Sequence, residues 1–166
     1  APERRNSRGV EFGERAALDR LLADVKAEVA DLEPVVDATP DQANAAVAAA
    51  RAGFAAWSRT PAAARAAALQ RAAHLLESRG GHFIALLQCE GGKTLDDALS
   101  ELRETVDFCR YYAAQGRKLF GSEIAMPGPT GESNTLAMRG RGVFVAISPW
   151  NFPLAIFLGQ VSAALM

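Results

Sequence analysis

Apolar residues recur at helical spacing over the first two thirds of the chain. In ERAALDRLLADVKAEVAD, residues 14–31, they return every three or four positions and form one face, which predicts a helix. A second helix is predicted from Pro40, because Thr39 can serve as its N-cap and Gln42 stands in the capping-box position. Proline is favoured at the first helical position, so the start of this helix is well marked.

Three further helices are predicted. Thr60-Pro61 repeats the Thr-Pro opening, and the alanine-rich helix that follows is expected to stop at Gly80-Gly81. HFIALLQCE is typical of a short helix, ended by Gly91-Gly92. A long helix is then expected from about Thr94 to Phe120, with an apolar stripe made of Leu95, Leu99, Leu102, Val106, Cys109 and Ala113.

The pattern changes after Gly121. MPGPTGESN is rich in proline and glycine and predicts a loop, and TLAMRGRGVFVAIS predicts two extended segments broken at Gly140 and Gly142. The second segment, Val143–Ile147, is apolar on both faces, as in a parallel strand buried between layers. Pro153 then opens an apolar helix that runs to the last residue. Because a parallel strand and its helix lead to another parallel strand, we expect the first part of an α/β domain whose remainder is absent.

Composition narrows the function classes. The 166 residues are 49% hydrophobic and 22% charged, which is typical of a globular domain. Eighteen Lys and Arg against nineteen Asp and Glu give a net charge of −1, so binding to nucleic acid or to an anionic membrane is not indicated. The longest apolar run is interrupted by Trp150-Asn151 and Gln160, and the N-terminus has no apolar signal segment, so we expect a cytoplasmic protein.

Several short motifs do not hold up. GGKT at residues 91–94 resembles part of a phosphate-binding loop, but Leu87 stands where that motif needs glycine, and a helix rather than a strand precedes it. GRGV at residues 140–143 offers two glycines of a dinucleotide fingerprint, yet Val145 takes the place of the third. Cys89 and Cys109 fit no metal-ligand spacing and are expected to be thiols in packing or surface roles, so no metal site is predicted.

Asn151 is the candidate for chemistry. It follows the predicted strand and precedes the last helix, at the edge of a sheet where open α/β domains bind ligands, and its amide could donate a hydrogen bond to an oxygen there. Asparagine is also a preferred N-cap, and a proline stands just inside the helix. Position alone leaves both interpretations open.

The motif ISPWNFPL resembles the end of the first core strand in the aldehyde dehydrogenase superfamily. More widely, the chain is similar to glutamate-semialdehyde (pyrroline-5-carboxylate) dehydrogenases, especially the dehydrogenase half of bifunctional proline utilization A enzymes. The segments that carry this similarity are GGKTLDDALSELRETVDFCRYYA, PGPTGESN and GRGVFVAISPWNFPLAIFLGQVSAAL. Near the start, NSRGV is similar to the lead-in of that half. The resemblance implies an α/β fold, with the N-terminal helical part and first strand-helix unit of an incomplete Rossmann-like NAD-binding domain. The units expected are a helical lead-in over 1–38, a helical part over 39–120, an oligomerisation flap over 121–142, and the first core strand and helix over 143–166.

The resemblance also implies roles for residues. Asn151 would form the oxyanion hole together with a backbone N–H of the catalytic cysteine, and Phe152 would line the aldehyde tunnel. The residues that would border NAD+ are Ile147, Ser148, Pro149 and Trp150. Glu104 matches a glutamate near the substrate entrance; its helical face carries Phe108 and Tyr111 and no basic partner, but a solvated carboxylate is the alternative.

The implied activity is NAD-dependent oxidation of L-glutamate γ-semialdehyde to L-glutamate in proline catabolism. The catalytic cysteine, the general base and the pyrophosphate-binding turn lie beyond Asn151 in this family, so the segment alone is expected to be inactive. Its expected partners are the aldehyde, the remainder of the dehydrogenase domain and further copies in a homo-oligomer; FAD would belong only to a preceding proline dehydrogenase domain. DLEPVVDATP lacks a pair of extended segments that the family has there. An aldehyde dehydrogenase for another substrate and a non-catalytic helical binding or assembly module remain alternatives.

Overall fold

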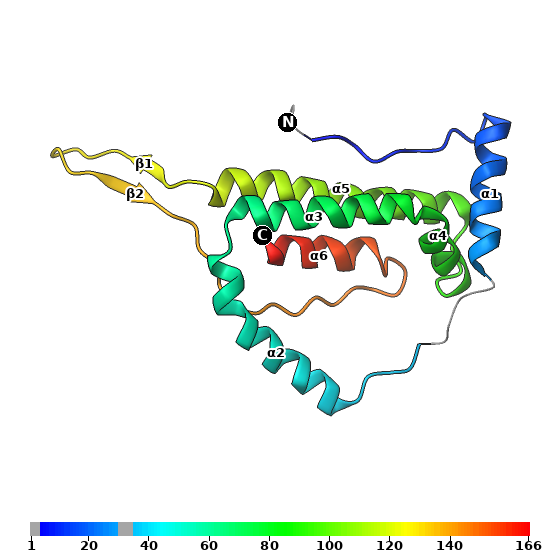
Figure 1. Cartoon of the computed structure of the whole chain (residues 1–166), viewed down its shortest axis with the longest axis horizontal. Helices are drawn as coiled ribbons and strands as arrows, with labels where there is room; N and C mark the ends of the chain where they lie inside the picture. Colours follow the sequence, from blue (N-terminus) through cyan, green and yellow to red (C-terminus); the bar gives the residue numbers. More distant parts are fainter. Residues whose placement is uncertain (1–3, 30–34) are drawn as a thin grey trace.

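The computed structural model describes residues 4–29 and 35–166 (Figure 1). Within these residues the chain forms six helices and one two-stranded antiparallel sheet. The elements in order are α1 (Arg15–Val29), α2 (Pro40–Arg59), α3 (Ala62–Ser78), α4 (Gly80–Cys89), α5 (Leu95–Phe120), β1 (Ile124–Met126), β2 (Asn134–Leu136) and α6 (Ala155–Leu165). None of the described helices is both long enough and apolar enough to cross a membrane.

The core lies among α3, α4 and α5, with α1 packed on α4 and α6 packed on α5 (Figure 1). We call these five helices the platform. The predicted stripe of α5 is confirmed, because five of its six positions are buried and Leu95 packs at the edge of the cluster. The main apolar cluster includes Leu21, Val25, Leu76, Ile84, Leu87, Leu99, Leu102, Val106 and Cys109.

Local capping signals at two helix starts are also confirmed. The Thr39 hydroxyl accepts the backbone N–H of Gln42, whose side chain in turn accepts the N–H of Thr39, which completes a capping box. Thr94 caps α5 by accepting the N–H of Asp97. The predicted helix over 14–31 is observed as α1, and its last two predicted positions lie outside the described residues, as do the first four residues of DLEPVVDATP.

Three helix starts differ from the prediction. Helix α6 begins at Ala155 rather than at Pro153. Helix α3 ends at Ser78, just before Gly80-Gly81 as predicted, but these two glycines already begin α4, which was expected from His82. A Cβ at Gly81 would lie 3.0 Å from the backbone carbonyl of Asp24 on α1. Glycine there permits the close approach of two helices. Thr60 does not cap α3: it is the C-cap of α2, and its hydroxyl donates to the Ala56 carbonyl.

Helix α6 is fixed to α2 and to α3 at its C-terminal end. The Trp57 indole N–H donates to the Leu165 carbonyl at 2.8 Å, and an Arg65 N–H donates to the Met166 carbonyl at 2.8 Å. The last carbonyl groups of a helix have no partner within the helix, and a cation near them is favourable. Side chains from α2 and α3 therefore cap α6.

The residues outside the platform are much more exposed. β1 and β2 pair in the register Ile124↔Leu136 to Met126↔Asn134, with every residue exposed, and they extend away from the helices (Figure 1). The prediction of a buried strand at Val143–Ile147 is wrong for this structure: in the part of the chain described, this segment forms no strand, and Ile147 is 78% exposed. The physical reason is that a strand needs a neighbour for its ladder of hydrogen bonds, and these residues pair with none.

Candidate functional site

The predicted site residues 147–152 form one turn that leads into α6. The Phe152 N–H donates to the Pro149 carbonyl at 3.2 Å, and the Ser148 hydroxyl lies 3.5 Å from the Pro153 carbonyl that accepts it. The Gln160 side chain reaches back from α6 and donates to the Ile147 carbonyl. Short-range hydrogen bonds therefore gather these residues, although Trp150 remains 82% exposed.

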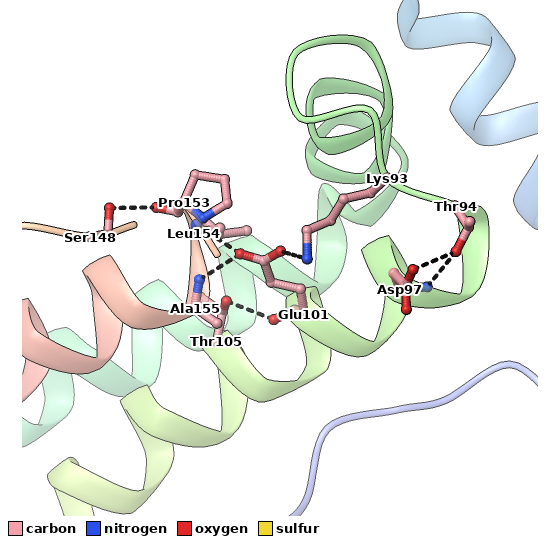
Figure 2. A network of polar contacts seen from close by, with 9 residues as sticks. All are labelled: Lys93, Thr94, Asp97, Glu101, Thr105, Ser148, Pro153, Leu154 and Ala155. Carbon is pink, nitrogen blue, oxygen red and sulfur yellow. Dashed lines mark hydrogen bonds and ion pairs between the residues drawn. The ribbon is translucent and has the colours of Figure 1, made fainter. Parts of the chain in front are cut away.

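Asn151 lies exposed in this turn and is not the cap of α6. The helix begins at Ala155, with Leu154 in the N-cap position, where its side chain provides no hydrogen-bond acceptor. The carboxylate of Glu101 on α5 takes that role: its Oε1 accepts the N–H of Leu154 at 2.9 Å and the N–H of Ala155 at 3.1 Å (Figure 2). The capping interpretation of Asn151 is therefore excluded.

Glu101 and Lys93 are site residues that the sequence reasoning missed. The Glu101 side chain is fully buried, and its Oε2 lies 2.5 Å from the Lys93 Nζ, off the axis of a directed hydrogen bond (Figure 2). Lys93 also lies over the Phe152 ring, 4.2 Å from its centre. The spacing along the helix could have indicated that Glu101 is buried. Glu101 stands three residues after Ala98 and four before Thr105, on the buried face of α5.

The two predicted substrate residues, Phe152 and Glu104, lie in different places. Phe152 is partly exposed beneath the Lys93 ammonium, within the same turn as Asn151. Glu104 lies exposed on α5, and among the described residues no hydrogen bond or ion pair connects it with the turn. The structure thus brings six of the seven predicted residues together and leaves Glu104 apart from them.

Two hollows in the surface lie away from the turn. One of about 300 Å³ lies between α2 and the segment that joins β2 to α6, at Arg51, Phe54, Gly142 and Val143. A larger one of about 660 Å³ lies among the N-terminal segment, α1, α4 and α5. Neither is lined by Glu104 or by residues 147–152. Within the described residues, no group of three or more acidic, His or Cys side chains is placed to hold a metal ion.

The cysteines differ in their surroundings. Cys109 is buried in the core, and removal from water raises the pKa of its thiol by disfavouring the thiolate. Cys89 is exposed at the end of α4. A thiol with a raised pKa is a poor nucleophile at neutral pH, so Cys109 serves packing, as predicted.

The fold and this turn agree with a family comparison: residues 26–166 match the aldehyde dehydrogenase family, and the chain belongs to that family. It is similar to the bifunctional protein PutA of Escherichia coli (strain K12), with 45% identity over 79% of this chain and 9% of the relative. A crystal structure of bifunctional proline utilization A (PutA) matches with a TM-score of 0.94 and 85% identity, over 99% of this chain and 17% of that one. A Thermus 1-pyrroline-5-carboxylate dehydrogenase with bound NAD matches with a TM-score of 0.85 and 26% identity, over 98% of this chain and 38% of that one.

These shares show that the chain spans only a small part of the proteins it matches. It is a mostly helical portion of the aldehyde dehydrogenase fold, similar to the dehydrogenase region of PutA proteins.

Proposed function

We propose that this chain is the N-terminal part of an NAD-dependent dehydrogenase domain that oxidises L-glutamate γ-semialdehyde to L-glutamate. Support comes from the family match and from the names of the similar proteins, which are PutA and 1-pyrroline-5-carboxylate dehydrogenase. In this proposal, residues 143–166 belong to the first strand-helix unit of a Rossmann-like domain. The strand would form when neighbouring strands from the rest of the enzyme supply its hydrogen-bond partners.

Asn151 would donate a hydrogen bond to the oxygen of the reacting aldehyde. When a cysteine thiolate adds to the carbonyl carbon, a C–S bond forms and the π electrons of the C=O bond move to oxygen, which becomes an alkoxide. A fixed amide N–H is worth most at that moment, because charge has developed at its acceptor. The observation that carries this proposal is that Glu101, rather than Asn151, accepts the first N–H groups of α6. The amide is therefore not required for capping.

The chain would also supply one wall of the NAD+ site. Ile147, Ser148, Pro149 and Trp150 form an exposed turn whose backbone can border a planar ring, which fits part of a dinucleotide site. NAD+ supplies the hydride acceptor when it is bound. The phosphate-binding turn and the cysteine would come from the rest of the domain, and the entrance glutamate would be Glu104.

Two surfaces would meet partners. The exposed β1–β2 hairpin would act as an oligomerisation flap between copies of the enzyme, and the exposed face of Val143–Ile147 would be covered by the remainder of the dehydrogenase domain. We propose a cytoplasmic location for the complete enzyme, and FAD only in a preceding proline dehydrogenase domain.

Replacement of Asn151 tests the proposed role in the full-length dehydrogenase that carries this segment. We expect Asn151→Ala to lower kcat and kcat/KM together by about 10² to 10³, with little change in NAD+ affinity, because the lost bond strengthens only in the transition state. Asn151→Asp should remain folded and be nearly inactive, since its charge opposes the alkoxide. Steady-state kinetics, NAD+ titration and thermal unfolding measure these effects. A stable, fully active Asp variant would refute the oxyanion role.

A further inference from the structure

Glu101 is a carboxylate in an otherwise apolar place. It is 1% exposed, between Ala98 and Thr105 on the face of α5 that meets α6. Burial of a charge is unfavourable unless the charge is paired and hydrogen-bonded. Here both oxygens are engaged: Oε1 accepts two backbone N–H groups at the start of α6, and Oε2 faces the Lys93 ammonium.

The contacts of this pair fall on the chain immediately after Asn151. Lys93 lies against the ring of Phe152, the next residue, and Glu101 binds the N–H groups three and four positions beyond Asn151 (Figure 2). The two hydrogen bonds to Glu101 hold the start of α6 at this point, and the helix dipole makes a negative charge favourable there. One buried pair therefore fixes both the start of the helix and the end of the turn.

The other side of Asn151 is fixed by bonds that stay within the same segment. They run from Phe152 to Pro149, from Ser148 to Pro153 and from Gln160 to Ile147. These bonds shape the turn, but they do not attach it to the platform. Lys93 and Glu101 provide that attachment, because they come from the start of α5 and the loop before it.

We propose that Glu101 and Lys93 are positioning residues that hold Asn151 in place for the reaction. This inference rests on the proposed function, in which the Asn151 amide faces the developing alkoxide. Displacement of a reacting group by about 1 Å can reduce a rate by about 10²-fold. The pair touches neither the aldehyde nor NAD+ in this proposal, so its loss should reduce the rate and leave binding largely intact.

Glu101→Gln in the full-length dehydrogenase tests the inference. Glutamine keeps an oxygen for the α6 N–H groups but removes the charge that faces Lys93, so we expect kcat to fall about tenfold, with the KM for NAD+ changed less than twofold. The matched control is Glu77→Gln. Glu77 forms a half-buried ion pair with Arg110 of α5, at 2.7 Å, and lies at the C-terminal end of α3, where its other partner is the Arg8 backbone N–H rather than α6. This control should keep kcat within about twofold of the wild type.

A double-mutant cycle separates positioning from general stability. If Glu101 acts through Asn151, Glu101→Gln should slow an Asn151→Ala enzyme by less than twofold, because the amide to be positioned is already gone. If the two losses in kcat multiply instead, Glu101 acts independently and the inference is wrong. Full activity of Glu101→Gln beside a slow Asn151→Ala variant overturns the positioning role alone. Full activity of Asn151→Ala overturns the oxyanion role and the inference with it.

Lys93 provides a second route that does not depend on the stability of Glu101→Gln. The Lys93 side chain is 11% exposed, and methionine and arginine are close to lysine in length, so neither replacement opens a large cavity. We expect Lys93→Met to lower kcat about tenfold and Lys93→Arg, which keeps the charge, to recover at least half of the wild-type value. Equal activity of Lys93→Met and wild type would contradict the proposal.

Discussion

The platform and the segments outside it both contain apolar residues but differ in what covers them. Ile84 on α4 is completely buried, whereas Ile147 in the turn before α6 is 78% exposed. Likewise α5 buries nine of its residues, while no residue of α2 within the described chain is buried. The apolar residues of α5 are buried by other helices of this chain. Those of Val143–Ile147 could be buried only against a surface that the described chain does not provide.

The two isoleucines give the largest test of this comparison. In the 166-residue chain, Ile84→Ala should lower the free energy of unfolding by about 2 to 5 kcal/mol, because it leaves a cavity in the core. Ile147→Ala should change it by less than about 0.5 kcal/mol, since the side chain is already in solvent. Urea unfolding of both variants measures the contrast. Equal effects would show that the turn is packed as tightly as the platform.

Ile147→Ala should have a different effect on stability in the full-length enzyme. There, on our proposal, strands from the remainder of the domain cover Val143–Ile147. Ile147→Ala should then become destabilising by about 2 kcal/mol or more. An effect that stays negligible in the longer protein would argue against burial of this segment.

Two helical glycines give a test of intermediate size. Gly81→Ala should lower the free energy of unfolding by about 1 to 3 kcal/mol, because the added Cβ would press on the Asp24 backbone and push α1 from α4. Gly53→Ala lies in α2, where a Cβ would meet nothing within 4 Å, so it should raise stability by about 0.4 to 1 kcal/mol. Thermal unfolding midpoints should move in opposite directions. A shift in the same direction would contradict the difference in packing.

Two glutamates give the smallest test, through pH. Burial of Glu77 favours its neutral form, but the hydrogen bonds from Arg110 and from the Arg8 backbone N–H outweigh burial and lower its pKa below the ordinary 4.5. Its ionised form therefore stabilises the fold above about pH 4.5, and this contribution is lost as the pH falls from there through the lowered pKa. Glu77→Gln should reduce stability at pH 7 by up to about 1 kcal/mol and weaken its acid dependence.

Glu132 is the exposed counterpart. A hydrogen bond from the Thr130 side chain lowers the pKa of this carboxyl, but the group lies in solvent at the tip of the β1–β2 hairpin. Because solvent screens this group, Glu132→Gln should change the pH dependence of unfolding less than Glu77→Gln does. Denaturant unfolding of both variants between pH 3 and pH 7, with wild type alongside, checks the pair.

Local signals in the sequence predicted helix starts and faces well. The capping box at Thr39 and the stripe of α5 depend on residues three or four positions apart, so they can be recognised without knowledge of the rest of the fold. Gly80-Gly81 marked the end of α3 correctly, but the start of α4 at these glycines, beside the Asp24 backbone of another helix, was not predicted because Asp24 is distant in sequence. The same limit applies to Val143–Ile147, whose pattern is that of a strand but whose partners are absent from the described structure.

In the candidate site, too, the residue found from the sequence has a local signal, and the residue missed has a distant partner. Asn151 was found from its place between an apolar segment and a helix, together with the motif around it, and the structure removes the capping alternative. Glu101 was not recognised from the sequence, although it stands on the buried face of α5. Its acceptor role depends on a helix start 53 residues later, which no local pattern reveals.

The attachment of α6 at both ends has a consequence for the order of folding. Its anchors at Glu101, Arg65 and Trp57 are separated from their backbone partners by 53 to 108 positions, so each contact closes a long loop. The entropy of loop closure is paid before such contacts form, whereas α3, α4 and α5 follow one another closely along the chain. Helix α6 should therefore dock late, onto α3, α4 and α5 that are already assembled, and the turn that carries Asn151 should be among the last parts of the chain to become ordered.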